Sequence, residues 1–353
     1  MRVAISMLTL VPGEMGGSES YARALCRALS ARTEVEAVAF VSAAAQAAGE
    51  GLRTEVVKEV PPGGSQLAKL KGMTAGVLRR RSIRSRFDGI DVVHYPFTVP
   101  IPPLRLPRVV TLHDLQHLDL PEMFTWQKRL FRRHAYDQAA RSADIVVVPS
   151  EFVRERAIAL LDLDPARVLV VPHGLDHELF FPSDGAREAF ILYPARPWPH
   201  KNHGRLLEAF ELLQRDRPEL TLVLTGGGTE TLAGADGVVA RGAVPLGELV
   251  ELYRLAACVV FPSLYEGFGA PPLEAMACGA PVASSDRGSL PEVCGDAAVL
   301  FDPLDPEAIA AAVSDALDRA DDLSRLGLAQ SARFTWASSA EGHECAYAAA
   351  AAR

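Results

Sequence analysis

The chain has 353 residues, more than a single hydrophobic core usually serves and enough for two domains of ordinary size. Hydrophobic residues make up 49% and charged residues 23%, which excludes a disordered chain, and the net charge of −8 argues against a nucleic-acid binder. The five cysteines form no C-x-x-C pair, which argues against a disulfide framework or a zinc ribbon and favours a reducing compartment.

Short β-branched runs alternate with amphipathic stretches in the first half, a pattern typical of parallel α/β architecture. The apolar start resembles a signal peptide, but the residues after Val11 offer no small-x-small cleavage site. No run of about 18 apolar residues predicts a membrane span, so we expect a soluble, cytoplasmic protein that begins with a buried strand. The expected strands are Arg2–Met7, Val35–Val41, Asp91–His94, Arg108–Leu112, Asp144–Val148 and Arg167–Val171, and the expected helices are Glu19–Ala31, Trp126–Ser142 and Phe152–Leu161.

The alternation restarts near residue 185, after a turn-rich linker at 182–185. The pattern predicts an α/β protein with two Rossmann-like, doubly wound domains, 1–180 and 181–336, and a C-terminal helix at about 337–353 that packs back on the first domain. Two such domains facing one another would leave a cleft between the carboxyl ends of both sheets, where ligands of these folds bind. The expected elements of the second domain are Ala189–Tyr193, His203–Arg215, Thr221–Leu224, Val238–Ala240, Leu246–Ala256, Cys258–Phe261, Pro272–Cys278 and Pro281–Ser284.

Charge is divided unevenly along the chain. Residues 1–175 hold 23 Lys and Arg against 18 Asp and Glu, a net +5, whereas the remainder holds 13 against 26, a net −13. The basic residues cluster at Arg79–Arg86 and at Lys128, Arg129, Arg132 and Arg133. One interpretation is a solvated helix face. The other is a surface for a phosphorylated acceptor or for anionic lipid, which would place the protein on the inner face of the membrane.

The most informative stretch runs from Pro262 to Gly279, after a predicted buried strand and into a predicted helix. Gly267 and Gly269 allow the backbone to approach a ligand closely. The amides of Phe268, Gly269 and Ala270 precede a helix N-terminus, which favours oxygen-rich, negatively charged ligands. Glu266 and Glu274 lie eight positions apart, so one saccharide–diphosphate–ribose ligand could span both. The alternative is a pair of solvated glutamates that flank an ordinary strand–helix turn.

This stretch resembles the E-x7-E motif of family 4 glycosyltransferases, and the resemblance extends over most of the chain. Further motifs follow in the family's order: Gly16-Gly17-Ser18-Glu19, Thr111-Leu112-His113-Asp114, Pro149-Ser150-Glu151-Phe152, Val171-Pro172-His173-Gly174-Leu175-Asp176, Arg196 with Lys201-Asn202, and Leu290-Pro291-Glu292-Val293 with Gly295-Asp296. The resemblance implies a GT-B fold and a hexosyltransferase that needs no metal, retains anomeric configuration and acts in polysaccharide or glycoconjugate biosynthesis. It implies a nucleotide-diphosphate sugar as co-substrate, no other cofactor, and a glycan, lipid-linked or small-molecule acceptor.

The resemblance also assigns roles to single residues. Glu266 contacts the donor sugar close to the reacting carbon, and Glu274 holds the ribose hydroxyls. Gly16 and Gly17 lie beside the donor phosphates and the acceptor. His113 contacts the donor sugar around its 6-hydroxyl. Phe268, Gly269 and Ala270 complete the donor-binding set.

Arg196 and Lys201 match the family's cationic pair. Negative charge grows on the departing diphosphate in the transition state, and two cations stabilise it where a metal would otherwise do so. A stiff Pro197-Trp198-Pro199-His200 segment separates the two, which makes the assignment of Arg196 weaker than that of Lys201. Solvated surface cations are the alternative.

Two histidine groups suggest a metal site as an alternative: His113 with Asp114 and His117, and His200 with His203. Each is a fragment without a matching partner cluster, and no Asp-x-Asp occurs on a suitable loop, so we expect no metal.

The residues leave open the donor base, the sugar, the acceptor and the route of transfer. A front-face reaction and a covalent intermediate on Glu266 both retain configuration. Rival functions on the same architecture are a sugar-nucleotide epimerase, a phosphorylase and a non-catalytic nucleotide-sugar-binding module. The presence of Glu266, Lys201 and Glu274 argues against the last of these.

Overall fold

The computed structural model describes residues 1–59 and 83–353, so residues 79–82 of the predicted basic run lie outside the described residues. The chain divides into two compact units: unit 1 is Met1–Gly174 with Trp336–Arg353, and unit 2 is Leu175–Thr335. The boundary therefore precedes the predicted residue 180. Leu175 and Phe180 are buried in the core of unit 2, and the Leu175 amide donates to the Phe334 carbonyl, which ties this segment to the second unit.

Unit 1 is built on a parallel sheet of seven strands in the order β3-β2-β1-β4-β5-β6-β7. Its strands are β1 Arg2–Met7, β2 Glu36–Val41, β3 Arg53–Val56, β4 Val92–Tyr95, β5 Arg108–Thr111, β6 Ile145–Val148 and β7 Val168–Val170. Its α-helices are α1 Gly17–Ser30, α4 Gln116–Asp119, α5 Trp126–Arg132, α6 Gln138–Ser142, α7 Glu151–Leu161 and α14 Trp336–Ala351. Shorter helical turns are η1 Ala43–Gly49, η2 Ser85–Phe87, η3 Pro121–Met123, the π-helical η4 Arg133–Asp137 and η5 Pro165–Arg167.

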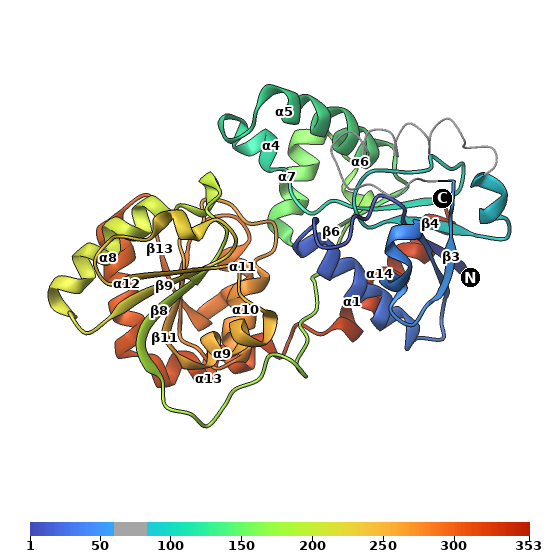
Figure 1. The fold of residues 1–353 in the computed structure, drawn as a ribbon. Helices are drawn as coiled ribbons and strands as arrows, with labels where there is room; N and C mark the ends of the chain where they lie inside the picture. Colours follow the sequence, from blue (N-terminus) through green and yellow to red (C-terminus); the bar gives the residue numbers. More distant parts are fainter. Residues whose placement is uncertain (60–82) are drawn as a thin grey trace. The chain divides into compact units, whose positions relative to one another are not determined.

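Side-chain alternation along the strands gives unit 1 a core on each face of its sheet. Val3 and Ile5 of β1 pack in the core that includes buried residues of α1 and α14. Ala4, between them, belongs to the opposite core, with buried residues of α6 and α7. Figure 1 shows α1 and α14 side by side, although they come from opposite ends of the chain. The C-terminal helix α14 thus belongs to the first unit.

Unit 2 holds a second parallel sheet, of six strands in the order β10-β9-β8-β11-β12-β13. Its strands are β8 Glu188–Pro194, β9 Thr221–Thr225, β10 Val238–Gly242, β11 Ala256–Phe261, β12 Val282–Ser285 and β13 Ala298–Phe301. Its α-helices are α8 His203–Asp216, α9 Leu246–Leu255, α10 Ala270–Ala277, α11 Leu290–Cys294, α12 Pro306–Asp318 and α13 Ala320–Ser331. The 3₁₀ turns are η6 Pro199–Lys201, η7 Thr229–Leu232 and η8 Gly295–Ala297. The predicted fold class, two parallel-sheet α/β domains, is confirmed.

Each sheet has one point at which the strand order reverses direction. In unit 1 it lies between β1 and β4, and in unit 2 between β8 and β11. In doubly wound folds, the loops at the carboxyl ends of the strands diverge at such a point, and ligands bind in the crevice between them. The loops after β8 and β11 are the ones that contain Lys201 and Glu266.

The predicted helix 126–142 is helical throughout, but its hydrogen-bond pattern changes where the π-helical turn η4 connects α5 to α6. Within residues 1–59 and 83–353, no helix is long and apolar enough to cross a bilayer.

Candidate active site

The two loops at the reversal point of unit 2 are fixed to one another by backbone and amide hydrogen bonds. The Leu264 amide, after β11, donates to the His200 carbonyl, after β8, over 2.8 Å. The buried Asn202 side chain donates to the carbonyls of Pro262 at 3.1 Å and Pro303 at 2.7 Å. Asn202 itself is left-handed, with φ of 59°, a conformation that asparagine tolerates better than most residues. The two loops are therefore held together before any ligand binds.

Lys201 and Glu266 meet across these loops. Lys201 Nζ lies 2.5 Å from Glu266 Oε1, and the two side chains are only 17% and 18% exposed. The Tyr193 hydroxyl donates to the Lys201 carbonyl over 2.7 Å, which fixes the backbone below the ammonium group. A lysine ammonium has three hydrogens, so Lys201 can hold Glu266 and a phosphate oxygen at once. The structure thus brings together two of the four residues predicted to be catalytic.

The Glu266 backbone rests on a segment that the sequence reasoning did not single out. Gly288 has φ of 65°, and a Cβ there would lie 2.7 Å from the Glu266 carbonyl oxygen. The Ser289 hydroxyl lies 3.1 Å from the Glu266 carbonyl and 2.6 Å from the Phe268 carbonyl. Only glycine permits this approach, and the serine then holds both ends of the turn. The signal in the sequence was a Gly-Ser pair directly before the quoted Leu290-Pro291 motif.

The turn after Glu266 leads into the N-terminus of α10. Gly269 is the N-cap residue, with φ of 98°, a left-handed conformation that favours glycine. Ala270 opens the helix and Pro271 follows in its first turn, where a proline loses no helical hydrogen bond. Phe268 is buried, and its ring lies edge-on to Phe334 at 5.8 Å. The arrangement directs a helix N-terminus, with its partial positive charge, to the crevice side of the sheet.

Glu274 lies in the same helix, and its carboxylate accepts a hydrogen bond from a buried tyrosine. The buried Tyr253 hydroxyl, on α9, donates to Glu274 Oε2 over 3.0 Å. Burial raises the pKa of Glu274 to about 7, while the Tyr253 hydrogen bond acts in the opposite direction by stabilising the carboxylate. A carboxylate in this state can accept hydrogen bonds from two hydroxyls, as the predicted contact with a ribose requires.

Arg196 stands apart from the Lys201–Glu266 pair. Its side chain is exposed, and its guanidinium carbon lies 5.9 Å from the centre of the Trp198 ring. The neighbouring backbone is tightly packed, because a Cβ at Gly226 would lie 2.7 Å from the Ala195 carbonyl carbon. The loop is thus fixed while its arginine extends into solvent, and Arg196 remains a predicted phosphate contact.

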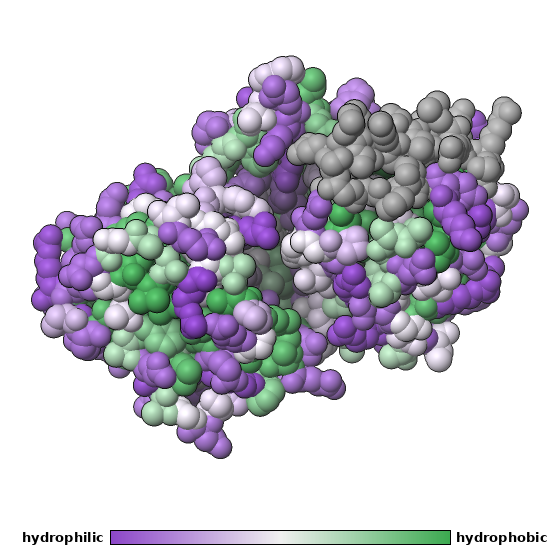
Figure 2. Space-filling model, in the orientation of Figure 1, coloured by the Kyte–Doolittle hydropathy of each residue, from purple (hydrophilic) through white to green (hydrophobic). Residues whose placement is uncertain are grey.

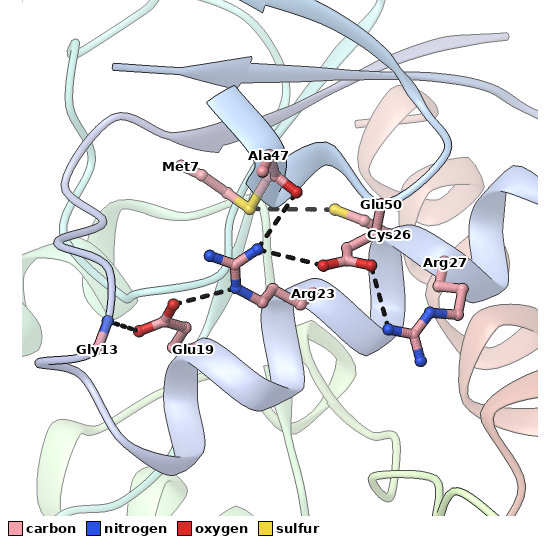
Figure 3. Close-up of polar contacts among 8 residues, drawn as sticks. All are labelled: Met7, Gly13, Glu19, Arg23, Cys26, Arg27, Ala47 and Glu50. Atoms are coloured by element: carbon pink, nitrogen blue, oxygen red, sulfur yellow. Dashed lines mark hydrogen bonds and ion pairs between the residues drawn. The ribbon is translucent and has the colours of Figure 1, made fainter. Parts of the chain in front are cut away.

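The glycine-rich loop of unit 1, at 13–17, connects β1 to α1. Gly13 and Gly16 have φ of 79° and 56°, and a Cβ at Gly16 or Gly17 would meet no atom within 4 Å. The Gly13 amide donates to Glu19 Oε2 over 2.8 Å (Figure 3). The other oxygen of Glu19 accepts from Arg23 Nε at 3.0 Å. The loop is therefore fixed by a charged side chain from the first turn of α1, with open space over its glycines.

Arg23 extends this support away from the loop. It also binds Glu50 Oε1 at 3.2 Å and the Ala47 carbonyl, and the other oxygen of Glu50 binds Arg27 at 3.1 Å (Figure 3). A chain of alternating charges thus connects the glycine loop to α1 and η1. Glu19 was quoted in the sequence only as part of a motif, and its contacts with Gly13 and Arg23 were missed.

His113 lies just beyond β5, and its tautomer is set by the backbone. Its Nε2 lies 2.8 Å from the Pro96 carbonyl oxygen, which can only accept, so Nε2 bears the hydrogen and Nδ1 is the acceptor nitrogen. Burial lowers the pKa of His113 below its ordinary value, which keeps the ring neutral. A neutral imidazole with Nδ1 as acceptor can bind a sugar hydroxyl, in agreement with the predicted role.

Buried polar groups lie beside His113. The Tyr21 ring of α1 is edge-on to His113 at 5.0 Å and stacked on His173 at 4.5 Å. The Tyr21 hydroxyl is 2.9 Å from Thr111 Oγ1 and 2.7 Å from Nε2 of His343, which comes from α14. Burial lowers the pKa of His343 to about 4, so this network is neutral at physiological pH. Helix α14 thus contributes directly to the packing around the candidate site of unit 1.

The histidine groups considered for a metal bind separate partners. His117 Nε2 lies 2.9 Å from Asp137 Oδ1, and Asp114 Oδ1 binds Arg132 at 2.7 Å. His203 Nε2 lies 3.1 Å from the Ala195 carbonyl. In the part of the chain that the structure describes, no three His, Cys, Asp or Glu side chains are grouped so that they could hold a metal ion.

Comparisons with known proteins match these two units in turn. The family model Glycosyltransferase Family 4 matches residues 15–179, and the model Glycosyl transferases group 1 matches residues 180–332. The O-antigen chain mannosyltransferase B of Escherichia coli is 32% identical over 66% of this chain and 68% of its own. The chain belongs to glycosyltransferase family 4. A D-inositol 3-phosphate glycosyltransferase of Actinosynnema mirum is 31% identical over 94% of this chain and 88% of its own.

Solved structures show the same fold. Sucrose-phosphate synthase from Thermosynechococcus elongatus superposes with a TM-score of 0.78 over 99% of this chain and 98% of its own, at 21% identity. The predicted GT-B fold, the predicted family and the prediction of a nucleotide-sugar glycosyltransferase are all confirmed. The comparisons do not test the residue roles within this glycosyltransferase, which stay predictions supported by the geometry above.

Proposed function

We propose that this glycosyltransferase moves a hexosyl group, with mannose the first candidate, from a nucleoside-diphosphate sugar to a saccharide acceptor that is free or lipid-linked. Mannose leads because O-antigen chain mannosyltransferase B is among the relatives above 30% identity. The observation that supports the donor site is the 2.5 Å Lys201–Glu266 pair beside the N-terminus of α10, at the reversal point of the sheet. A cation and a helix N-terminus together fit a diphosphate.

In the proposed reaction the donor C1–O bond to diphosphate breaks as a C1–O bond to the acceptor forms. Lys201 and the α10 N-terminus stabilise the charge that grows on the departing phosphate, so no metal or further cofactor is required. Glu274 binds the ribose, and Glu266 and His113 bind donor-sugar hydroxyls. The acceptor hydroxyl proton passes to the departing phosphate oxygen, which leaves on the face where the acceptor attacks and so retains configuration.

The ion pair favours this front-face route over a covalent intermediate. A carboxylate bound at 2.5 Å by an ammonium group has its negative charge neutralised, which weakens it as a nucleophile. Glu266 therefore acts by binding and electrostatics. If it were the nucleophile instead, a glycosyl adduct on Glu266 should accumulate with slow donor analogues and be visible by mass spectrometry.

The function is tested with a panel of UDP- and GDP-hexoses and simple glycoside acceptors, in buffer with excess EDTA. We expect turnover with at least one donor, no loss with EDTA, and NMR of the first product showing the donor's anomeric configuration. Activity that disappears with EDTA and returns with Mg²⁺ or Mn²⁺ would contradict metal independence. Epimerised donor formed without acceptor would favour the epimerase instead.

A further inference from the structure

Helix α5 presents its large apolar side chains to solvent. Trp126, Leu130 and Phe131 are 69%, 59% and 43% exposed. Trp126 and Leu130 are four residues apart and so lie on one face of the helix, with Phe131 beside them. The region over α5, at the top of Figure 2, shows hydrophobic and hydrophilic atoms next to one another. Exposed apolar side chains grouped on one helix in this way indicate a candidate interaction surface.

The opposite side of α5 holds the basic residues, and one of them anchors the helix to unit 1. Arg132 Nη1 binds Asp114 Oδ1 at 2.7 Å, and its guanidinium lies 5.0 Å from the centre of the Phe124 ring. Lys128 and Arg133 are exposed on the flank. The helix is therefore attached to unit 1 by the Arg132–Asp114 ion pair, while its apolar and other cationic side chains are exposed to solvent. Glu122 is the one exposed acidic residue between residues 121 and 138.

We propose that α5 docks unit 1 on an anionic lipid bilayer, with Trp126, Leu130 and Phe131 in the interface and Lys128 and Arg133 at the headgroups. Amphipathic helices with aromatic residues on one face and basic residues on the other bind membranes in this way. The basic flank complements anionic lipid, and each basic side chain near such a surface strengthens binding by a factor of about five.

A second copy of the chain fits the surface less well than a bilayer. The three side chains expose roughly 300 Å² together, given about 150–250 Å² for a large aromatic residue, whereas a stable interface buries about 800 Å² on each partner. A bilayer requires no matching surface and tolerates a small inserted area when charge adds to it.

One ion pair connects the docking surface to the candidate active site. Asp114, which Arg132 binds, directly follows His113 in the chain. Docking through α5 would therefore hold the His113 loop at the membrane surface, where a lipid-linked acceptor presents its sugar. This last step rests on the proposed function, but the membrane contact itself does not.

The test is flotation of the full chain with vesicles of phosphatidylglycerol and phosphatidylcholine, compared with phosphatidylcholine alone. We expect binding to the anionic vesicles at low salt that fades as salt rises. The triple variant Trp126→Ser, Leu130→Ser, Phe131→Ser should lose at least tenfold in partitioning. The double variant Lys128→Gln, Arg133→Gln should lose about 25-fold, because two factors of five multiply. The matched control changes three exposed leucines of unit 2 to serine, Leu246, Leu304 and Leu328, and should bind like the wild type.

Tryptophan fluorescence gives an independent measure of insertion. Anionic vesicles should shift the emission of the wild type and of Trp198→Phe to the blue, and this shift should vanish in Trp126→Phe. Calorimetry with UDP and GDP on every variant establishes that unit 2 is folded. It also separates the two proposals, because a wild type that binds neither nucleotide would contradict the donor site and leave the docking surface untouched. The docking surface would be overturned if the wild type did not float with anionic vesicles at low salt, or if the triple variant floated equally well. It would also be overturned if the wild type bound no vesicles but formed a dimer that the triple variant converted to a monomer.

Discussion

The two units place different chemistry at equivalent points of similar sheets. At the reversal point of unit 2, an ammonium group and a carboxylate meet at 2.5 Å beside a helix N-terminus. At the reversal point of unit 1, the loop is built of glycines, and the neighbouring His113 is kept neutral by burial. The charges of unit 1 that support this loop, Glu19 and Arg23, are engaged with one another and with the backbone.

This difference matches the two kinds of ligand that a sugar transfer brings together. A diphosphate acquires charge as it departs, so fixed charges and helix dipoles stabilise it most. Sugar hydroxyls are neutral and need oriented acceptors and space, which a neutral imidazole and exposed glycines supply. In the proposed function, the charged groups of unit 2 thus stabilise the leaving group, whereas unit 1 recognises a donor-sugar hydroxyl with a neutral group. Each prediction below asks whether that division holds.

The largest effect is expected at Glu266. Glu266→Gln removes the charge beside Lys201 and the strongest acceptor near the reacting carbon, so kcat should fall about 10²–10³-fold, as when one preorganised group is removed from an active site. Steady-state kinetics measure the change. Glu219→Gln, an exposed residue of the same unit, serves as control and should leave kcat unchanged. A kcat within threefold of wild type would remove Glu266 from the reaction.

Donor affinity should depend next on Glu274. Glu274→Ala loses a charge-assisted hydrogen bond to the ribose, so nucleoside-diphosphate binding should weaken by about 1.5–3 kcal/mol. Isothermal titration calorimetry measures it directly. Affinity for the free sugar acceptor should not change, because the residue belongs to unit 2. A variant with unaltered nucleotide affinity would show that the ribose lies elsewhere.

Binding of an intact nucleotide sugar should also depend on pH through Glu274. The pKa of Glu274 is raised to about 7, so the carboxylate that accepts the ribose hydroxyls forms only as pH rises through that value. Affinity should therefore increase by up to about tenfold between pH 6 and pH 8. An intact nucleotide sugar avoids the terminal-phosphate ionisation near pH 6 that free nucleoside diphosphates undergo.

Two variants check the source of this pH dependence. Glu274→Gln should abolish it. Tyr253→Phe removes the hydrogen bond that stabilises the carboxylate, so the midpoint should move to higher pH. A midpoint that is the same in all three proteins would assign the titration to another group.

The smallest effect is expected in unit 1. His113→Ala removes a neutral hydrogen bond to a sugar hydroxyl, worth about 0.5–1.5 kcal/mol, so kcat/KM should fall roughly 2- to 10-fold. The affinity for UDP or GDP should stay at the wild-type value, because the diphosphate binds unit 2. Equal losses in nucleotide affinity and in kcat/KM would contradict the division between the units.

Much of this architecture follows from sequence periodicity. The strands β1, β4, β5, β8 and β11 occur close to where short apolar runs predicted them, because strands buried on both faces are almost continuously hydrophobic. Two of the four edge strands, β3 and β13, escaped prediction; β3 has only exposed and half-buried residues and lacks an apolar run. The π-helical turn η4, within the predicted helix 126–142, was not predicted, because the apolar spacing gave no sign of it.

The candidate site was predictable only where its residues form contiguous motifs. Glu266, Glu274 and Lys201 belong to such motifs, and the structure brings Lys201 and Glu266 into contact. Tyr253 and Ser289 were missed because each acts through a partner more than 20 residues away in the chain. A single tyrosine in a helix or serine in a turn has many ordinary explanations, and only tertiary structure places it under a carboxylate or a carbonyl.

The central claim is that Lys201 holds the diphosphate, and calorimetry on one matched pair of variants tests it most directly. Lys201→Ala and the exposed Lys58→Ala remove the same charge from unit 2 and unit 1. The account predicts that Lys201→Ala weakens binding of the cognate nucleoside diphosphate by about 1.5–3 kcal/mol, whereas Lys58→Ala matches the wild type. Equal affinity in Lys201→Ala and Lys58→Ala would contradict it.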